Sequence, residues 1–271
     1  MSANPLGEQV ANPNGYDPGV LFAIPRQAAR SRLNLDAGIP MHGLDHWNAY
    51  EMSWLNQRGK PQVALGELFF SADSQNIVES KSLKLYLNSL NQERFSDRRS
   101  LIEVMEKDLA AVSKSPVKIL LTDVNRATAE TSARRGESLD LQDISVEVFQ
   151  PEADLLEVSQ HRVADAAHYS HLFRSTCPVT GQPDWASVEI RYSGNRLDAA
   201  CLLQYLCSYR EHQGYHEECC ERIYRDLFKA VAPKQLFIAM NFLRRGGLDI
   251  NVYRSSDPVD TGQILPRTLR Q

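Results

Sequence analysis

The segment STCPVTGQPDW, residues 175–185, holds the residues best suited to covalent chemistry. Cys177 lies in a loop rich in Pro and Gly, and Asp184 follows seven residues later. A cysteine thiolate acts as a nucleophile when a nearby cation or hydrogen-bond donor lowers its pKa, and Arg174 or the loop backbone is placed to do so. A carboxyl group beside Trp185 is suited to acid catalysis, because an indole excludes water. The alternative is that Cys177 is a small apolar residue under a loop and Asp184 a turn residue.

The segment ESKSLKLY, residues 79–86, is denser in polar groups than its apolar flanks. The carboxylate of Glu79 can accept two hydrogen bonds from adjacent ring N–H and amino groups, which is the face that guanine presents. Lys81 and Lys84 carry charges suited to phosphate. The alternative is a solvated edge between a strand and a helix.

Two further segments have ligand-binding chemistry. RRGG, residues 244–247, combines two guanidinium groups with a glycine turn whose N–H groups suit phosphate. His216 and Glu217 open a helical pattern, where a glutamate complements the helix dipole. The alternatives are an ordinary hairpin tip and ordinary helix-start chemistry.

The sequence does not predict a metal site or a common nucleotide-binding loop. HEECC resembles the start of a zinc-protease helix, but Cys220 stands where the second histidine is required. His161, His168 and His171 are close in sequence without a matching ligand set. Neither GxGxxG nor GxxxxGK[ST] is present. We therefore expect no metal.

Composition excludes several classes of protein. The net charge of −4 over 271 residues is not that of a protein that binds nucleic acid through a basic face. No apolar run approaches the ~18 residues that a membrane helix needs, and the N-terminus does not resemble a signal peptide. The five cysteines form no CxxC pair, and four fall in helical patterns. We expect a cytoplasmic protein with no membrane segment and no direct contact with nucleic acid.

The sequence pattern of the first half of the chain predicts strands on either side of a helix. Strands are expected at 61–70 and 117–124, where apolar residues dominate. Between them, residues 96–115 place apolar side chains at helical spacing behind Ser96 and Asp97, which suit an N-cap.

The second half repeats this order. Alternation predicts strands at 144–150 and 187–192, and SGN at 193–195 is a turn signal. Asp198 is suited to cap a helix, and a second helix is expected through 216–231. The residues around RRGG predict a closing β-hairpin.

These patterns predict an α+β fold with antiparallel strands and segregated helices. We expect an irregular segment at 1–20, a first unit at 21–135 carrying ESKSLKLY, and a second unit at 136–271 carrying Cys177 and Asp184.

Taken together, the motifs resemble a known enzyme family. ESKSLKLYLNS, STCPVTGQPDW, HEECCE and RRGGLDIN, in this order and spacing, are similar to the long form of the NADPH-dependent 7-cyano-7-deazaguanine reductases. MHGLDHWNAYEMSWLN near the start extends the resemblance over nearly the whole chain. The resemblance implies two tandem tunnelling folds (T-folds) and a homodimer. It also implies reduction of a nitrile to a primary amine with two NADPH in queuosine biosynthesis.

The resemblance also implies roles for individual residues. Cys177 matches the nucleophile that forms a covalent thioimidate with the nitrile carbon, and Asp184 matches the proton donor. The residues expected to bind the deazapurine are Glu79, Ser80, Lys81, His216 and Glu217. The residues expected to hold NADPH are Lys81, Ser82, Arg245 and Gly246.

Two other functions stay open at this point. One is a purine- or pterin-binding T-fold enzyme such as a cyclohydrolase, which would need a metal or His/Cys set that the sequence does not offer. The other is a binding module that has kept Glu79 and lost catalysis, against which the pair Cys177 and Asp184 argues.

Overall fold

The computed structural model describes residues 13–35, 38–125, 127 and 131–271. The chain divides into two compact units, each built from separated segments. Unit 1 comprises Met1–Ala28, Asp45–Ala129 and Arg244–Asp249, and unit 2 comprises Ala29–Leu44, Glu130–Leu243 and Ile250–Gln271. Residues 1–12 of the N-terminal segment that we expected to be irregular lie outside the described residues. The expected boundary at 135/136 stays a prediction.

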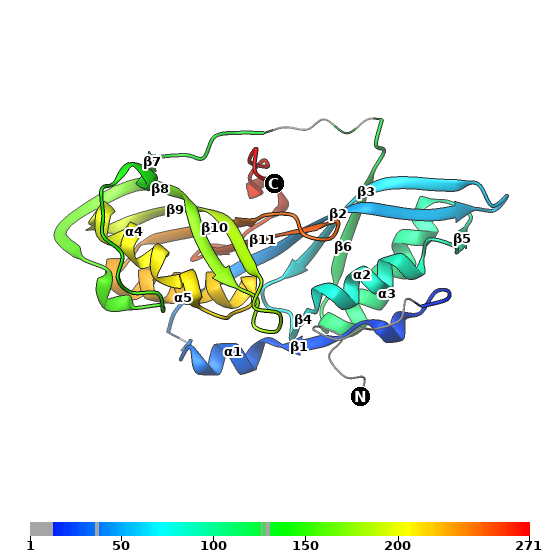
Figure 1. Cartoon of the computed structure of the whole chain (residues 1–271), viewed down its shortest axis with the longest axis horizontal. Coiled ribbons are helices and arrows are strands. Elements are labelled where there is room, and N and C mark those ends of the chain that lie inside the picture. The colour runs from blue at the N-terminus through cyan, green and yellow to red at the C-terminus, as the bar shows by residue number, and fades with distance from the viewer. Residues whose placement is uncertain (1–12, 36–37, 126, 128–130) are drawn as a thin grey trace. The chain divides into compact units, whose positions relative to one another are not determined.

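Unit 1 is a strand layer with helices α2 and α3 (Figure 1), while helix α1 and strand β2 each lie partly in unit 1 and partly in unit 2. Strands β6, β3 and β2 are neighbours in that order, β5 pairs with β2, and β1 pairs with β4. Helix α3 begins behind Asp97, whose side chain accepts the Ser100 N–H in a capping box, as the sequence predicted. The elements are β1 (Ala23–Pro25), α1 (Arg26–Arg32), β2 (His42–Asn56), β3 (Pro61–Ser71), β4 (Asn76–Val78), α2 (Ser80–Ser89), β5 (Arg94–Phe95), α3 (Arg98–Ser113) and β6 (Val117–Thr122).

Unit 2 has the same kinds of element. Strands β11, β10, β9, β8 and β7 are neighbours in that order, with antiparallel pairing from β11 to β8. Asp198 caps α4 through the Cys201 N–H, as predicted. The elements are β7 (Glu137–Ser138), β8 (Val158–Thr176), β9 (Pro183–Leu197), α4 (Ala199–Cys207), α5 (His216–Val231), β10 (Gln235–Phe242) and β11 (Leu248–Ser255).

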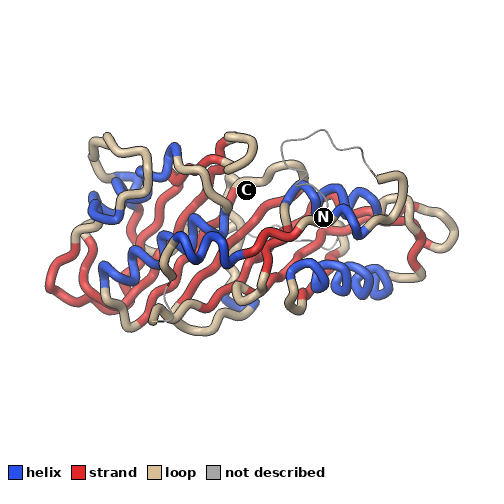
Figure 2. Tube along the Cα trace, turned by 90° about the horizontal axis from the view of Figure 1, so that it is seen from below, coloured by secondary structure: helices blue, strands red, loops and turns tan. Residues whose placement is uncertain are grey.

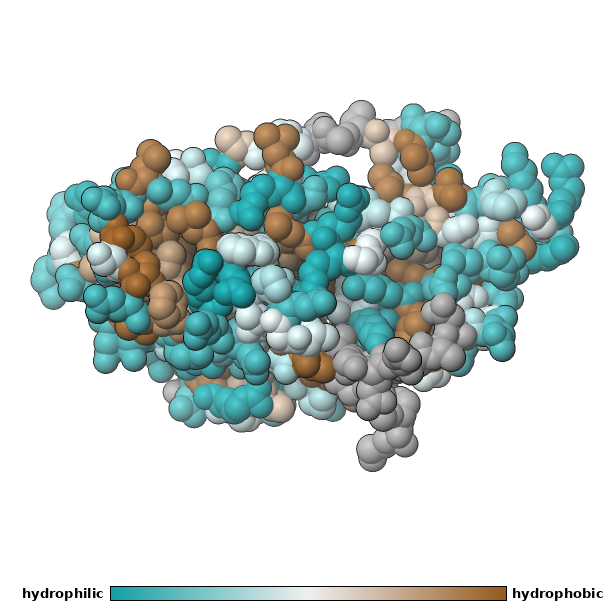
Figure 3. Space-filling model, viewed as in Figure 1, coloured by the Kyte–Doolittle hydropathy of each residue, from teal (hydrophilic) through white to brown (hydrophobic). Residues whose placement is uncertain are grey.

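The core of unit 2 lies between its strands and α5. Ile223, Leu227 and Val231 lie on one stripe of α5 and are fully buried, as the helical spacing predicts. On β9 the alternate residues Val188 and Ile190 are fully buried. Figure 2 shows helices (blue) packed against strands (red) in this way. The exposed face in Figure 3 is mostly hydrophilic, with apolar residues among the polar ones.

Two local predictions were wrong. Residues 144–150 form no strand, because none of them is buried and they pair with no strand; Gln204 instead donates to the Ser145 carbonyl oxygen. SGN at 193–195 is not a turn but part of β9, where Gly194 pairs with Val163. Glycine is present there because the end of α5 comes close: an added Cβ would lie 2.6 Å from the Val231 carbonyl oxygen.

Replacing Gly194 with alanine should therefore destabilise unit 2. We expect Gly194→Ala to lower the free energy of unfolding by about 1–3 kcal/mol, the usual cost of overpacking. Chemical denaturation measures this change. Gly38→Ala is the matched control, because a Cβ at Gly38 meets nothing within 4 Å. Equal stability of the two variants would contradict the packing explanation.

Candidate active site

The end of the β8–β9 hairpin brings Cys177 and Asp184 close together in the ladder. Ser175 pairs with Asp184, and Thr176 pairs with Pro183. Cys177 continues this register, since its N–H donates to the Gln182 carbonyl oxygen over 2.8 Å. The six residues between Cys177 and Asp184 thus form the end of one hairpin.

The strand period places both side chains on the same face. Ser175 and Asp184 are paired, and Cys177 lies two residues beyond Ser175. Diagonal neighbours in such a ladder lie about 7–8 Å apart, within reach of side chains. Cys177 is 8% exposed and Asp184 4% exposed. A thiol and a carboxyl group therefore lie on one sheltered face.

The start of α5 meets the same hairpin end. The Thr176 N–H and hydroxyl both donate to the His212 carbonyl oxygen, over 2.8 and 3.0 Å, and the Gly214 N–H donates to the Thr176 carbonyl oxygen. Helix α5 begins two residues after Gly214, at His216. The chain that precedes the nucleophile is therefore fixed to the chain that precedes His216.

The imidazole of His216 lies beside the carboxyl group of Asp184. Its Nε2 lies 3.7 Å from Asp184 Oδ1, and its ring packs against Phe242 with centroids 4.1 Å apart. Glu217 follows on α5 and is buried. The structure therefore brings His216 beside Asp184, with Cys177 on the same face of the hairpin, and Glu217 follows His216 in the chain.

The other cysteines are poorly suited to act as nucleophiles. Burial raises the pKa of Cys219 to about 12, while a hydrogen bond from Ser175 opposes the shift. Burial also raises the pKa of Cys201 and of Cys207. Cys220 is fully buried, with its Sγ directed at the Val252 carbonyl oxygen. Cys177 is thus the cysteine that combines a loop position with a neighbouring acid.

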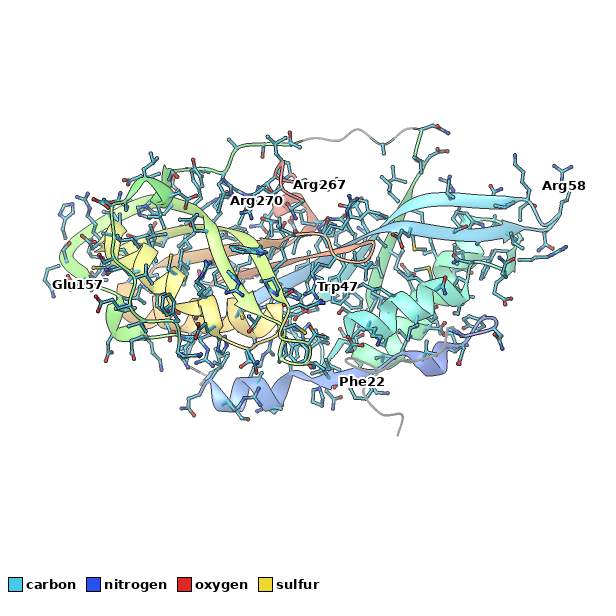
Figure 4. All side chains as sticks on the ribbon, in the orientation of Figure 1. Phe22, Trp47, Arg58, Glu157, Arg267 and Arg270 are labelled. Atoms are coloured by element: carbon cyan, nitrogen blue, oxygen red, sulfur yellow. The ribbon has the colours of Figure 1, made fainter. Side chains whose placement is uncertain are left out.

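Two expectations about the surroundings of Cys177 were wrong. Arg174 and Trp185 are paired with each other in the ladder, so the strand alternation turns both toward the face opposite Ser175 and Asp184. The Arg174 guanidinium donates to the Arg210 carbonyl oxygen and lies 5.8 Å from the Trp185 ring. Arg270, labelled in Figure 4, lies 6.0 Å from the same ring. Arg174 is therefore not placed to activate the thiol, and packing against α5 rather than the indole shelters Asp184.

In unit 1, Glu79 is the N-cap of α2. Its carboxylate oxygens accept the Lys81 N–H and the Ser82 N–H, each over 2.7 Å, and the side chain is 1% exposed. The Ser80 hydroxyl lies 3.4 Å from Glu79 Oε1. Sequence reasoning missed this capping role, although a carboxylate at the start of a helical pattern is its usual signal. The residue predicted to read a purine thus also fixes the start of a helix.

The four residues predicted to hold a nucleotide differ in exposure. Lys81 is half-buried at the start of α2. Ser82 is fully buried; its hydroxyl donates to the Glu79 carbonyl oxygen and accepts the N–H of Phe22, which Figure 4 labels. Arg245 and Gly246 lie in the turn before β11, where the Arg245 N–H donates to the Leu248 carbonyl oxygen. A contact between Ser82 and a cofactor stays a prediction.

Sequence reasoning also missed His212. Burial lowers the pKa of its imidazole to about 4, and the nearby Arg222 charge adds to this shift. Its signal in the sequence was weak, since one histidine before a helix has no distinctive spacing.

Among the described residues, no group of three or more His, Cys, Asp and Glu side chains is arranged to hold a metal ion. None of the described helices has the length and hydrophobicity of a bilayer span.

The lowered pKa of His212 predicts how stability depends on pH. Between the ordinary value of 6.5 and about 4, the unfolded chain binds more protons at this group than the folded chain does. Stability from His212 is therefore present above pH 6.5 and is lost as pH falls toward 4. Denaturation midpoints between pH 7 and pH 5 should fall more steeply in the unmodified protein than in His212→Gln. Parallel slopes would contradict this assignment.

Comparison with known proteins shows which family the chain resembles. Residues 12–121 match the family "Nitrile reductase, 7-cyano-7-deazaguanine-reductase N-term", and residues 183–260 match "QueF-like protein". Three curated relatives are each described as an NADPH-dependent 7-cyano-7-deazaguanine reductase. The relative from Chromohalobacter salexigens is 48% identical over 267 residues, covering 98% of this chain and 95% of that protein. The relative from Bordetella pertussis is 46% identical over 257 residues, covering 94% of each chain. The relative from Bordetella avium is 43% identical over 271 residues, covering 100% of this chain and 98% of that protein.

The two family matches fall one in each half of the chain, and the long strands among the described elements pair antiparallel, with few helices. The predicted α+β class with tandem T-fold units is confirmed. The chain belongs to the family of NADPH-dependent 7-cyano-7-deazaguanine reductases.

Proposed function

We propose that this chain reduces the nitrile of 7-cyano-7-deazaguanine to the primary amine in queuosine biosynthesis. The observation that carries this proposal is the placement of Cys177 and Asp184 on one buried face of the β8–β9 hairpin. The net reaction adds two hydrides and two protons to the C≡N group, and NADPH supplies the hydrides when it is bound.

Cys177 and Asp184 make the nitrile reducible. The Cys177 thiol loses its proton as its sulfur bonds to the nitrile carbon, and Asp184 gives a proton to the nitrile nitrogen, which leaves a C=N thioimidate. After the first hydride has been added to carbon, the C–S bond breaks and an imine is left, and the released thiolate takes a proton back to restore the thiol. The second hydride and the second net proton convert the imine to the amine. A buried face favours these steps, because the imine must be kept from water.

His216 is placed to supply Asp184 with a new proton after each transfer. At 3.7 Å from Asp184, its imidazole returns a proton to the carboxylate between the two reductive steps. Glu217, buried beside it, accepts hydrogen bonds from the substrate.

Glu79, with Ser80 and Lys81, recognises the deazapurine ring. A carboxylate has about four acceptor positions; the cap of α2 uses two of them, and the Ser80 hydroxyl donates to a third over 3.4 Å. When that hydroxyl turns to the substrate, two positions are open for a ring N–H and an amino group. Because the helix N–H groups fix the carboxylate before the substrate arrives, little side-chain entropy is lost on binding.

The segments that hold NADPH are the start of α2, with Lys81 and Ser82, and the turn with Arg245 and Gly246. Gly246 has φ +56°, a left-handed conformation that turns backbone N–H groups outward. The cationic side chains of Lys81 and Arg245 suit the phosphates of NADPH. We further propose that the protein is a cytoplasmic homodimer that acts on a free small molecule and does not bind nucleic acid.

Cys177→Ala should abolish turnover while leaving substrate binding largely intact. The expected loss is complete within detection, because no other group can form the thioimidate. NADPH oxidation measures turnover, and equilibrium titration of the nitrile measures binding. Cys201→Ala on α4 is the matched control and should stay active. Activity in Cys177→Ala would refute the covalent mechanism.

Glu79→Gln should weaken binding of the deazaguanine by about 1.5–3 kcal/mol, because a charge-assisted contact becomes a neutral one. Glutamine keeps only one of the two oxygens that cap α2, so the loss of capping has to be measured separately from the loss of recognition. Titration calorimetry gives the dissociation constant, and a melting curve reports the cap. An unchanged dissociation constant would remove Glu79 from the substrate site.

A further inference from the structure

Ser175, near the end of β8, carries a buried hydroxyl group that the fold does not satisfy. The residue is 0% exposed, and among the described residues its Oγ has no hydrogen-bond partner. Buried polar side chains are nearly always hydrogen-bonded, because an unsatisfied group has lost its water without replacement. Alanine differs from serine by this one oxygen atom and would avoid the loss. The hydroxyl group therefore weakens the fold at this position.

Cys219, on α5, is a poor partner for this hydroxyl. A hydrogen bond from Ser175 favours the Cys219 thiolate, yet burial raises the pKa of that thiol to about 12. At neutral pH Cys219 is therefore a neutral thiol, which is a weak acceptor. The hydroxyl and this thiol do not meet the geometry of a hydrogen bond. The donor capacity of Ser175 is thus left for another group.

Asp184 lies directly across the ladder from Ser175. The two residues are paired in register, and the Cβ atoms of such a pair lie about 4.5–5.5 Å apart on one face. Both residues also interact electrostatically with Cys219, so both side chains point toward α5. Rotation about a single bond directs the serine hydroxyl at its cross-strand neighbour. A rotatable donor therefore faces the carboxyl group that is proposed to give the proton.

The proposed proton transfer creates a need for this donor. When Asp184 gives its proton to the nitrile nitrogen, a negative charge forms on a side chain that is only 4% exposed. A buried carboxylate is costly unless hydrogen bonds stabilise its charged form. A hydroxyl group donates such a bond without giving up its own proton. Because the bond strengthens as the charge develops, it lowers the barrier of the step.

We propose that Ser175 is a positioning residue that donates a hydrogen bond to the Asp184 carboxylate as that carboxylate forms. Ser175 acts through Asp184 and bonds to neither the nitrile nor the sulfur of Cys177. This inference rests on the proposed function and adds a residue to it. It also explains why a hydroxyl that weakens the fold stands at this position.

The test is the rate of thioimidate formation in Ser175→Ala, followed as mass gain against time with 7-cyano-7-deazaguanine and no NADPH. We expect the adduct to form about ten- to a hundredfold more slowly, because a hydrogen bond to a developing charge is lost. The dissociation constant of the nitrile should be unchanged, measured with Cys177→Ala also present so that no adduct forms. The melting temperature should be unchanged or higher, because no satisfied hydrogen bond is removed.

Ser187→Ala is the matched control. Ser187 is a fully buried serine of β9, and its Oγ lies 2.7 Å from His171 Nδ1. It is three residues from Asp184, so the strand alternation turns it to the opposite face. Ser187→Ala should lower the melting temperature and leave the rate of adduct formation unchanged, which is the reverse of the result expected for Ser175→Ala.

Cys219→Ala shows through which group the hydroxyl acts. If Ser175 acts through Asp184, Cys219→Ala should form the adduct at the rate of the unmodified protein. Equal slowing in Cys219→Ala and Ser175→Ala would assign the effect to the buried thiol and overturn the inference.

The remaining outcomes separate the inference from the proposed function. An unchanged rate in Ser175→Ala would overturn the inference and leave the proposed function standing. A slower rate together with a lower melting temperature and weaker nitrile binding would give Ser175 a structural role, which also overturns it. Failure of the unmodified protein to form any adduct would instead overturn the proposed function.

Discussion

The hydrogen bonds between Thr176 and the segment 212–214 are the constraint on which the reaction site depends. Three bonds join the last residue of β8 to the chain that enters α5. On one side of this junction the chain continues into Cys177, and on the other side it continues into His216. Because backbone groups make most of these bonds, they fix the two segments regardless of the neighbouring side chains. A thiol, a carboxyl group and an imidazole are thus fixed in position before any substrate arrives.

Backbone hydrogen bonds also fix the side chain of Glu79. Its carboxylate stabilises the first turn of α2 and stays inside the protein, where an unpaired charge would be costly. The helix N–H groups satisfy that charge and hold it in one orientation, and the remaining lone pairs are aimed by the fold. The proposed recognition of a purine face therefore requires no rearrangement of this side chain. The groups proposed for catalysis and for recognition are both held by hydrogen bonds to the backbone.

Local sequence patterns predicted the features that short-range interactions determine, such as helix caps and the buried face of a helix. Asp97 and Asp198 were expected to be helix caps, and the stripe on α5 was expected to be buried, because short-range contacts decide both. The motifs also identified Cys177, Asp184 and His216 as a set, through the family resemblance. Long-range pairing was harder to predict. Residues 193–195 were predicted to be a turn but belong to β9, where Gly194 is packed closely against Val231. The orientation of Arg174 follows from the register of the β8–β9 ladder, which no local pattern reveals.

The most direct test of the covalent mechanism is the intact mass of the protein after incubation with 7-cyano-7-deazaguanine in the absence of NADPH. We expect a gain of one substrate mass, located on the peptide that contains Cys177 and removed when NADPH is added. A bound substrate with no mass gain, or a gain located on another cysteine, would contradict the assignment of Cys177 and Asp184 to the formation of one adduct.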